Sequence, residues 1–437
     1  MRSQLRWGIL AGAVVVACKF APGPSGTNMI DAPVIADAGV CTGITAECAG
    51  SETLRTCLGS GQMANDTVCS WGCLGPSAHC GKLAPTGGGV LPTDLDPDPM
   101  LADIPLVGTI DGNTGGISGL RPAGSPGQII NGIGYYMRGN IAVFRFKAIR
   151  ITGNQLALGG DHPIALVATG DILVDDQVDV QGACSGSAAG PGGFRGGGAG
   201  SDATGSGGGH GGSTDAFAGG GGGGNGSDGG SGGVGPATVV GLGAAGTAFG
   251  DPLVMVLVGG GGGGGGGHGA APIGGGGGGA LQLVANGTIK ITTNGEINAG
   301  GCGGTKGASG DSGGGGGAGG TIVLEAHDLY VNGKLGVNGG GGGAGGGGND
   351  GDNAVVDRGL TGGGPGGNAD GGSGAGGATL AGLPGKVGSS KSGGGGGGIG
   401  RMRFTTYTGL ATVDNTNLSP ALDDNPTTCT LGSAAVK

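Results

Sequence analysis

The stretch ALQLVANGTIKITTNGEINAGG, residues 280–301, decides the fold, because it is the clearest copy of a unit that recurs along the chain. It divides into three short segments rich in apolar and β-branched residues. The pairs Asn286-Gly287 and Asn294-Gly295 separate these segments, and Asn-Gly favours tight turns. The unit therefore predicts three strands joined by two turns. Such a unit cannot bury its own apolar face and needs neighbours of the same kind.

Four further copies supply those neighbours, at residues 141–160, 163–182, 321–339 and 399–412. Five units of about 20 residues, each with three strands, are typical of a parallel β-helix. In that fold each strand pairs with its equivalent one rung away, and the crossovers are expected to be right-handed. The sequence therefore predicts a mainly β protein whose solenoid of about five rungs spans residues 141–420. An antiparallel β-sandwich with chance similarity between its strands is the alternative.

The composition is unusual for a globular chain, since 126 of the 437 residues are glycine and only 3% are aromatic. No strict Gly-X-Y period runs through the sequence, which excludes collagen. The formal net charge is −10. Nucleic acid is not an expected partner, because the chain has no basic stripe and no cluster of basic and aromatic residues.

The N-terminal residues 1–18 have the pattern of a lipoprotein signal peptide. Arg2 and Arg6 precede an apolar segment that is too short to span a bilayer, and Val15-Val16-Ala17-Cys18 resembles a bacterial lipobox. We therefore expect Cys18 to be acylated and the protein to be exported and membrane-anchored, at the outer membrane or cell surface. A cleaved secretory signal or an uncleaved anchor is the alternative.

A short cysteine-rich segment follows a small-residue tether at 19–40. Six cysteines within residues 41–80 predict a module held by three disulfides, for which fifteen pairings are open. A zinc site is the less favoured reading, because His79 is the sole histidine there. The cysteines concerned are Cys41, Cys48, Cys57, Cys69, Cys73 and Cys80.

Three further segments are assigned from composition. Residues 81–103 are rich in Pro, Gly and Asp and predict a stiff linker. Calcium binding by Asp94, Asp96 and Asp98 is the less favoured reading, since the EF-hand pattern is absent. Residues 104–140 are expected to cap the first rung, and residues 421–437 to form a C-terminal tail.

Three glycine-rich inserts, at 183–279, 302–319 and 340–398, interrupt the repeats directly after the third strand of a unit. Backbone entropy favours a flexible coil. Glycine chains in the extended conformation with three residues per turn can instead approach closely and bond to several neighbours, as in polyglycine II, and we expect this packed state for runs such as 259–267 and 393–398. The apolar segment 253–258, LVMVLV, is expected to be a buried strand beneath the packed glycines.

Two cysteines test the alignment of the repeats. Cys184 and Cys302 lie just past the third strand of successive units. Stacked rungs should bring their Cα atoms near the 4.4–6.8 Å range that a disulfide requires. The sequence gives no partner for Cys429.

Enzyme motifs are weak in this chain. The sequence GDSGG at 310–314 matches the surroundings of the nucleophile in chymotrypsin-like proteases, but it lies inside an insert and no histidine has a recognisable family context. Asp171, Asp175, Asp176 and Asp179 lie in one unit, and no stacked carboxylate pair can be identified. We therefore expect no enzymatic activity, no metal site and no cofactor.

These features together resemble the glycine-rich exported lipoproteins that recur in myxobacteria, whose plan is a lipobox, a cysteine-rich segment and strand units that end in glycine runs. The inserts are also similar in kind to the glycine-rich tips of some phage tail-fibre adhesins. The lipoprotein family has no established activity, so the resemblance implies location and architecture. We expect a structural or adhesive surface protein whose partners are the membrane, through its lipid, and a surface glycan or neighbouring envelope proteins. The alternative is a β-helix that binds or degrades polysaccharide.

Overall fold

The computed structural model describes residues 43–213, 217–234, 243–269 and 272–437. Contacts divide the chain into two compact units. Among the described residues, one unit contains 43–45 and 56–65, and the other contains 46–55 and 66–437. The structure is mainly β, and the described residues include no α-helix.

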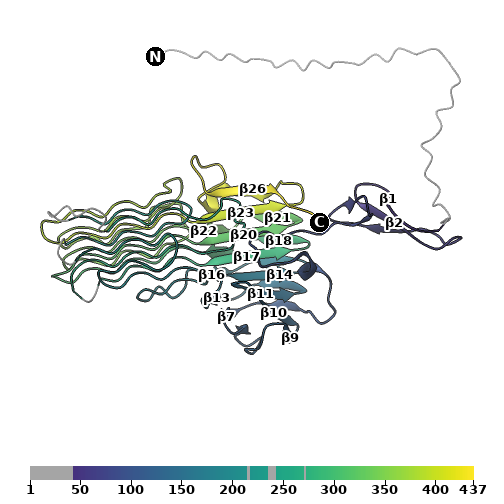
Figure 1. Ribbon diagram of the computed structural model, residues 1–437, viewed down its shortest axis with the longest axis horizontal. Coiled ribbons are helices and arrows are strands. Elements are labelled where there is room, and N and C mark those ends of the chain that lie inside the picture. The colour runs from purple at the N-terminus through teal and green to yellow at the C-terminus, as the bar shows by residue number, and fades with distance from the viewer. Residues whose placement is uncertain (1–42, 214–216, 235–242, 270–271) are drawn as a thin grey trace, which may run out of the picture. The chain divides into compact units, whose positions relative to one another are not determined.

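Three sheets contain most of the strands of the larger unit, and from β11, β12 and β13 onward each strand pairs with the strand three further along the chain (Figure 1). The first sheet runs β26 (Cys429–Ser433), β23 (Arg401–Thr406), β20 (Thr321–Ala326), β17 (Ala280–Ala285), β14 (Ile164–Ala168), β11 (Ile141–Phe146), β10 (Ile133–Arg138), β9 (Gln128–Ile130). The second runs β24 (Thr412–Val413), β21 (Asp328–Val331), β18 (Thr288–Ile291), β15 (Ile172–Val174), β12 (Ala148–Ile151), β6 (Asp103–Pro105). The third runs β25 (Leu418–Ser419), β22 (Lys334–Gly336), β19 (Glu296–Asn298), β16 (Gln177–Asp179), β13 (Leu156–Gly159), β7 (Gly108–Asp111), β8 (Gly116–Ile117).

The pairing between repeats is parallel and in the register that the sequence units predict. In the first sheet Leu166 pairs with Leu283, and Leu283 pairs with Leu324. In the second sheet Ile172 pairs with Ile289. Each strand of a repeat therefore meets the equivalent strand of the next one, and the antiparallel alternative is wrong for these repeats.

One buried apolar cluster takes side chains from all three sheets, among them Leu283, Ile289 and Ile297. A second cluster lies on the other face of the first sheet, where Val284 and Val323 contact Trp71, Leu83 and other residues. Both faces of this sheet are therefore covered. This explains why β11, β14, β17 and β20 consist wholly of buried residues.

The segment 81–103 corrects the linker prediction. Leu83 and Leu95 are buried in the second apolar cluster, and η1 (Pro92–Leu95) lies within this segment. The carboxylate of Asp94 forms ion pairs with Arg138 and Arg145, so it is used by the fold rather than offered to calcium. Composition hid these contacts, because a few well-placed apolar residues and one carboxylate suffice to fix a Pro- and Gly-rich chain to a sheet.

The two ends of the repeat region are longer than the sequence indicates. In the expected cap, β6 and β7 pair in parallel with β12 and β13 and so add part of an earlier repeat. Strand β10 is antiparallel to both β9 and β11 and covers the end of the first sheet. In the expected tail, β26 pairs in parallel with β23. The chain end then runs beside residues 82–84, where Lys82 and Lys437 exchange backbone hydrogen bonds.

The cysteine-rich segment contains β1 (Ile44–Cys48), β2 (Thr53–Leu58) and β3 (Asn65–Val68) in one sheet, and β4 (Cys73–Leu74) and β5 (His79–Cys80) in another. Disulfides join Cys48 to Cys73 and Cys69 to Cys80. Cys57 is also disulfide-bonded, and Cys41 lies outside the described residues. Residues 46–55 and 66–80 group with the repeats, so 41–80 is not a separate domain by its contacts.

Candidate functional site

The glycine-rich inserts are the candidate functional site, because all three leave the sheets at the same point of the repeat. They follow β16, β19 and β22, and Figure 1 shows these segments running together away from the sheets. Six runs within and beside the inserts are wholly buried, and we call them the central runs. They are residues 218–225, 259–267, 274–279, 311–320, 337–345 and 391–400. Residues 259–267 and 393–398, which were expected to pack, are buried along their whole length.

Hydrogen bonds between the central runs repeat every third residue. The six amides of 393–398 donate in turn to three neighbouring chains over 2.8 to 3.0 Å. Residues 393 and 396 donate to the carbonyls of 386 and 383, residues 394 and 397 to those of 343 and 340, and residues 395 and 398 to those of 220 and 223. A chain that turns to a new neighbour at each residue and returns after three has three residues per turn.

Glycine is required in these runs because neighbouring backbones occupy the space of a side chain. A Cβ atom on Gly394 would lie closer than 3.0 Å to the carbonyl oxygen of Gly314, and one on Gly263 equally close to that of Gly315. At Gly198, on an outer part of the first insert, a Cβ would meet nothing within 4 Å. These glycines of the central runs therefore leave no room for a side chain, whereas outer positions such as Gly198 admit one.

The outer run 382–388, GLPGKVG, shows how side chains are admitted. Gly382, Gly385 and Gly388 are buried, and the four residues between them are exposed. Gly382 and Gly385 donate to the carbonyls of Asp228 and Ser231 at 3.2 and 2.9 Å. The spacing G-x-x-G-x-x-G is therefore the mark of a run at the edge of the glycine segments, and sequence analysis missed it.

A disulfide joins the first two inserts at their base. Cys184 and Cys302 are bonded, with a Cα separation of 5.2 Å, inside the range that the aligned repeats predict. The two cysteines are 118 residues apart in sequence. Only stacking of the repeats accounts for this proximity.

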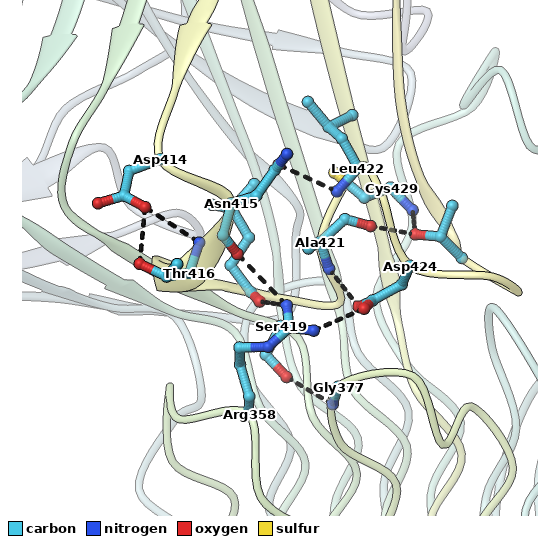
Figure 2. Close-up of polar contacts among 12 residues, drawn as sticks. Arg358, Gly377, Asp414, Asn415, Thr416, Ser419, Ala421, Leu422, Asp424 and Cys429 are labelled. Carbon is cyan, nitrogen blue, oxygen red and sulfur yellow. Dashed lines mark hydrogen bonds and ion pairs between the residues drawn. The ribbon is translucent and has the colours of Figure 1, made fainter. Parts of the chain in front are cut away.

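The third insert is fastened to the last repeat by polar contacts (Figure 2). The Arg358 guanidinium donates to the carbonyl oxygen of Leu418 at 2.7 Å and pairs with the Asp424 carboxylate at 2.5 Å. The hydroxyl of Ser419 accepts a hydrogen bond from the backbone amide of Gly377 at 2.9 Å. These contacts hold an outer part of the insert against the end of the sheets.

The apolar segment 253–258 corrects the prediction of a buried strand. No strand forms there, and Leu253, Met255 and Val256 are exposed. Val254 and Leu257 alone are well buried, in the second apolar cluster. The chain turns at Asp251, whose carbonyl accepts the amide of Val254, and its backbone then bonds to Gly87 of segment 81–91 at Val254 and Leu257.

The four aspartates of the second repeat accept hydrogen bonds from nearby residues of the same chain. Asp171 accepts the amide of Thr288 at 2.8 Å, and Asp175 accepts the hydroxyl of Thr292. Asp176 accepts the amide of Gln177. Asp179 accepts the amide of Gln181 at 2.9 Å, and its burial raises the pKa of its carboxyl above the ordinary value. The first two contacts tie one repeat to the next.

Residues 311–314 of the protease-like sequence GDSGG lie in a central run. The Ser312 hydroxyl donates to the carbonyl oxygen of Phe217 at 2.7 Å, whereas His268 contacts Asp311 at 3.4 Å. A serine nucleophile needs its hydroxyl to donate to a base. The hydroxyl of Ser312 is therefore used to fix the chain.

The predicted acylation site, Cys18, lies outside the described residues. Cys429 has a free, buried thiol, and burial raises its pKa. Within the described ranges, no group of three or more His, Cys, Asp or Glu side chains is placed to hold a metal ion. His79 instead contacts the carbonyl of Ser77.

Comparisons with protein-family models, with curated proteins and with solved structures find no match for this chain. In the part of the chain that the structure describes, no helix has the length and apolar character to cross a bilayer.

Proposed function

We propose that the three sheets are the faces of a right-handed parallel β-helix and that the inserts form a polyglycine II bundle projecting from one of its corners. The parallel register of every repeat supports the first part. The three-residue cycle of hydrogen bonds in 393–398 supports the second.

The proposed role is structural or adhesive, at the surface of the cell. The carrying observation is the packing of the central runs, where neighbouring backbones fill the space that side chains would take at the glycines. Backbone amides and carbonyls supply neither nucleophiles nor acids and bases, but their dense cross-bonding makes a stiff projection. Loops held by a rigid scaffold commonly carry recognition. The protein would be anchored by a lipid on Cys18 and would present the bundle to a surface glycan or an envelope protein.

The outward face of the second sheet bears on the polysaccharide alternative. Its central column contains Arg150, Leu173, Lys290, Tyr330 and Thr412, one above the other. Binding a sugar chain along this face would call for stacked aromatic rings, and Tyr330 is the one aromatic residue of the column. The column thus favours the structural role.

The experiment compares attachment of beads that carry the exported protein to an array of glycans and envelope preparations. Deletion of residues 185–279 should abolish attachment, because it removes three of the six central runs and exposes the other three. Gly198→Ala is the matched control and should attach like the wild type, since its side chain meets no neighbour. Unchanged attachment by a deletion variant that keeps its β-type circular dichroism, or cleavage of polysaccharide by the intact protein, would contradict the proposal.

A further inference from the structure

A buried polar cluster lies where segment 81–91 crosses the outer face of the first sheet. It consists of Thr86 from that segment, Gln282 from β17 and Glu325 from β20. The Gln282 and Glu325 side chains are fully buried. Thr86 is half-buried, and its hydroxyl thus meets a buried carboxamide and a buried carboxylate, although Thr86 and Gln282 are 196 residues apart.

The carboxylate joins the other two groups. The Thr86 hydroxyl donates to Oε1 of Glu325 at 3.0 Å, and Nε2 of Gln282 donates to Oε2 at 2.6 Å. The same Nε2 donates to the carbonyl oxygen of Thr86 at 3.1 Å. A Cβ on Gly87 would lie 3.3 Å from Cδ of Gln282, so the carboxamide carbon packs against the residue next to Thr86. Within the described residues, Oε1 of Gln282 is buried without a hydrogen-bond partner.

We propose that Thr86 and Gln282 form an intramolecular ester cross-link. Oγ1 of Thr86 attacks Cδ of Gln282, the new Oγ1–Cδ bond forms, and the Cδ–Nε2 bond breaks. The hydroxyl proton and the amide nitrogen with its two protons leave together as ammonia. No oxidant, reductant or other reactant is needed.

Glu325 is the catalytic residue of this step. Its Oε1 accepts the hydroxyl proton as the nucleophile attacks, and the carboxyl returns a proton to Nε2 as the leaving group departs. Burial raises the pKa of Glu325 above its ordinary value. The hydrogen bonds from Thr86 and Gln282 and the positive charge of Arg403 lower it, but the effect of burial is larger. A raised value suits a carboxyl that both takes and returns a proton.

Two effects favour the product. Groups held in contact by a fold react with effective molarities of about 10⁵ M or more, which offsets the ordinary preference for the amide. Ammonia is also lost to the solvent, so the reverse step lacks its reactant. The cross-link would fix segment 81–91 to the sheet covalently, next to the disulfides that end at Cys73 and Cys80.

The test is the intact mass of the full exported chain after reduction of its disulfides, followed by peptide mapping. We expect a mass lower by about 17 Da, one ammonia, and a peptide in which residues 86 and 282 are joined. Full mass with separate peptides would overturn the proposal. A loss of about 18 Da, one water, would overturn it too, since Thr86 would then be esterified to a carboxyl such as Glu325.

Two substitutions separate chemistry from folding. Thr86→Ser keeps the hydroxyl and should retain the cross-link. Thr86→Val keeps the shape and should give the full mass, as should Glu325→Gln, whose side chain cannot accept and return the proton. A cross-link that survives Glu325→Gln would overturn the role of Glu325.

Discussion

At the scale of the residue, the central runs depend on the absence of a Cβ atom. Gly394→Ala places a methyl group against the carbonyl of Gly314 and should destabilise the protein by about 1–3 kcal/mol or more, as overpacking does. Denaturant titration measures the free energy of unfolding of Gly394→Ala and of the control Gly198→Ala, whose methyl group meets nothing within 4 Å. Equal stabilities of the two variants would contradict the packing described here.

The burial of Asp179 should make the stability of the protein depend on pH. Burial raises the pKa of its carboxyl above the ordinary 3.8, so the folded state binds a proton more tightly than the unfolded state does. Its contribution to stability is therefore fully present below pH 3.8 and is lost as the pH rises through the raised value. Asp179→Asn should remove this loss, and unfolding free energies measured across that window should fall less steeply than in the wild type. Parallel curves would show that Asp179 does not titrate in this way.

At the scale of the element, the Cys184–Cys302 disulfide holds two inserts at their exits. For a loop of 118 residues, the chain-entropy model gives about 4–5 kcal/mol of stabilisation. The double variant Cys184→Ser/Cys302→Ser should lose a large part of this, while the order of the strands stays the same. The check is unfolding of the double variant beside the wild type, both with the other disulfides intact. A change below about 1 kcal/mol would mean that the bond adds little constraint.

The repeats could be predicted from sequence because each strand carries its own local signal. Alternating apolar residues and Asn-Gly turns mark the strands near residues 280–298, and the structure has β17, β18 and β19 there. Segment 81–103 could not be predicted, because its structure depends on distant partners such as Arg138 and on a sheet face that sequence does not reveal. Residues 253–258 failed for the same reason. Their apolar pattern is typical of a strand, but residues 253–258 pair with no strand of a sheet.

The candidate site was predictable in position and not in detail. The sequence located the site, because a glycine-rich insert follows the third strand in each of three units. The cluster of Thr86, Gln282 and Glu325 left no trace in the sequence, because its members lie in three distant segments. The spacing of Gly382, Gly385 and Gly388 was readable, but it has meaning only when one side of the run is known to be buried.

At the scale of the whole molecule, the stacked repeats explain how glycine can be ordered. Fixing a residue's backbone costs about 1–2 kcal/mol, and a hydrogen bond returns about 0.5–1.5 kcal/mol net, so a free glycine chain stays a coil. The stacked repeats hold the exits of the three inserts near one another, which reduces the loop-closure cost of contacts between the inserts. The bundle should therefore not form from the inserts alone.

The proposed anchor is also a property of the whole chain. Cys18→Ala removes the acylation site and should move the exported protein from the membrane fraction to the soluble fraction. Its far-ultraviolet circular dichroism should match that of the wild type, because Cys18 precedes the repeats in the sequence. Unchanged fractionation of the variant would mean that Cys18 is not the anchor.

The central claim is that the inserts are packed and ordered, and hydrogen–deuterium exchange of the intact protein, followed by mass spectrometry of its peptides, tests it most directly. The amides of the central runs donate to neighbouring carbonyls, so peptides that cover 259–267, 313–319 and 393–398 should exchange as slowly as β17 and β20. If those peptides exchange completely at the earliest time point while the strands stay protected, the inserts are coils and the account is wrong.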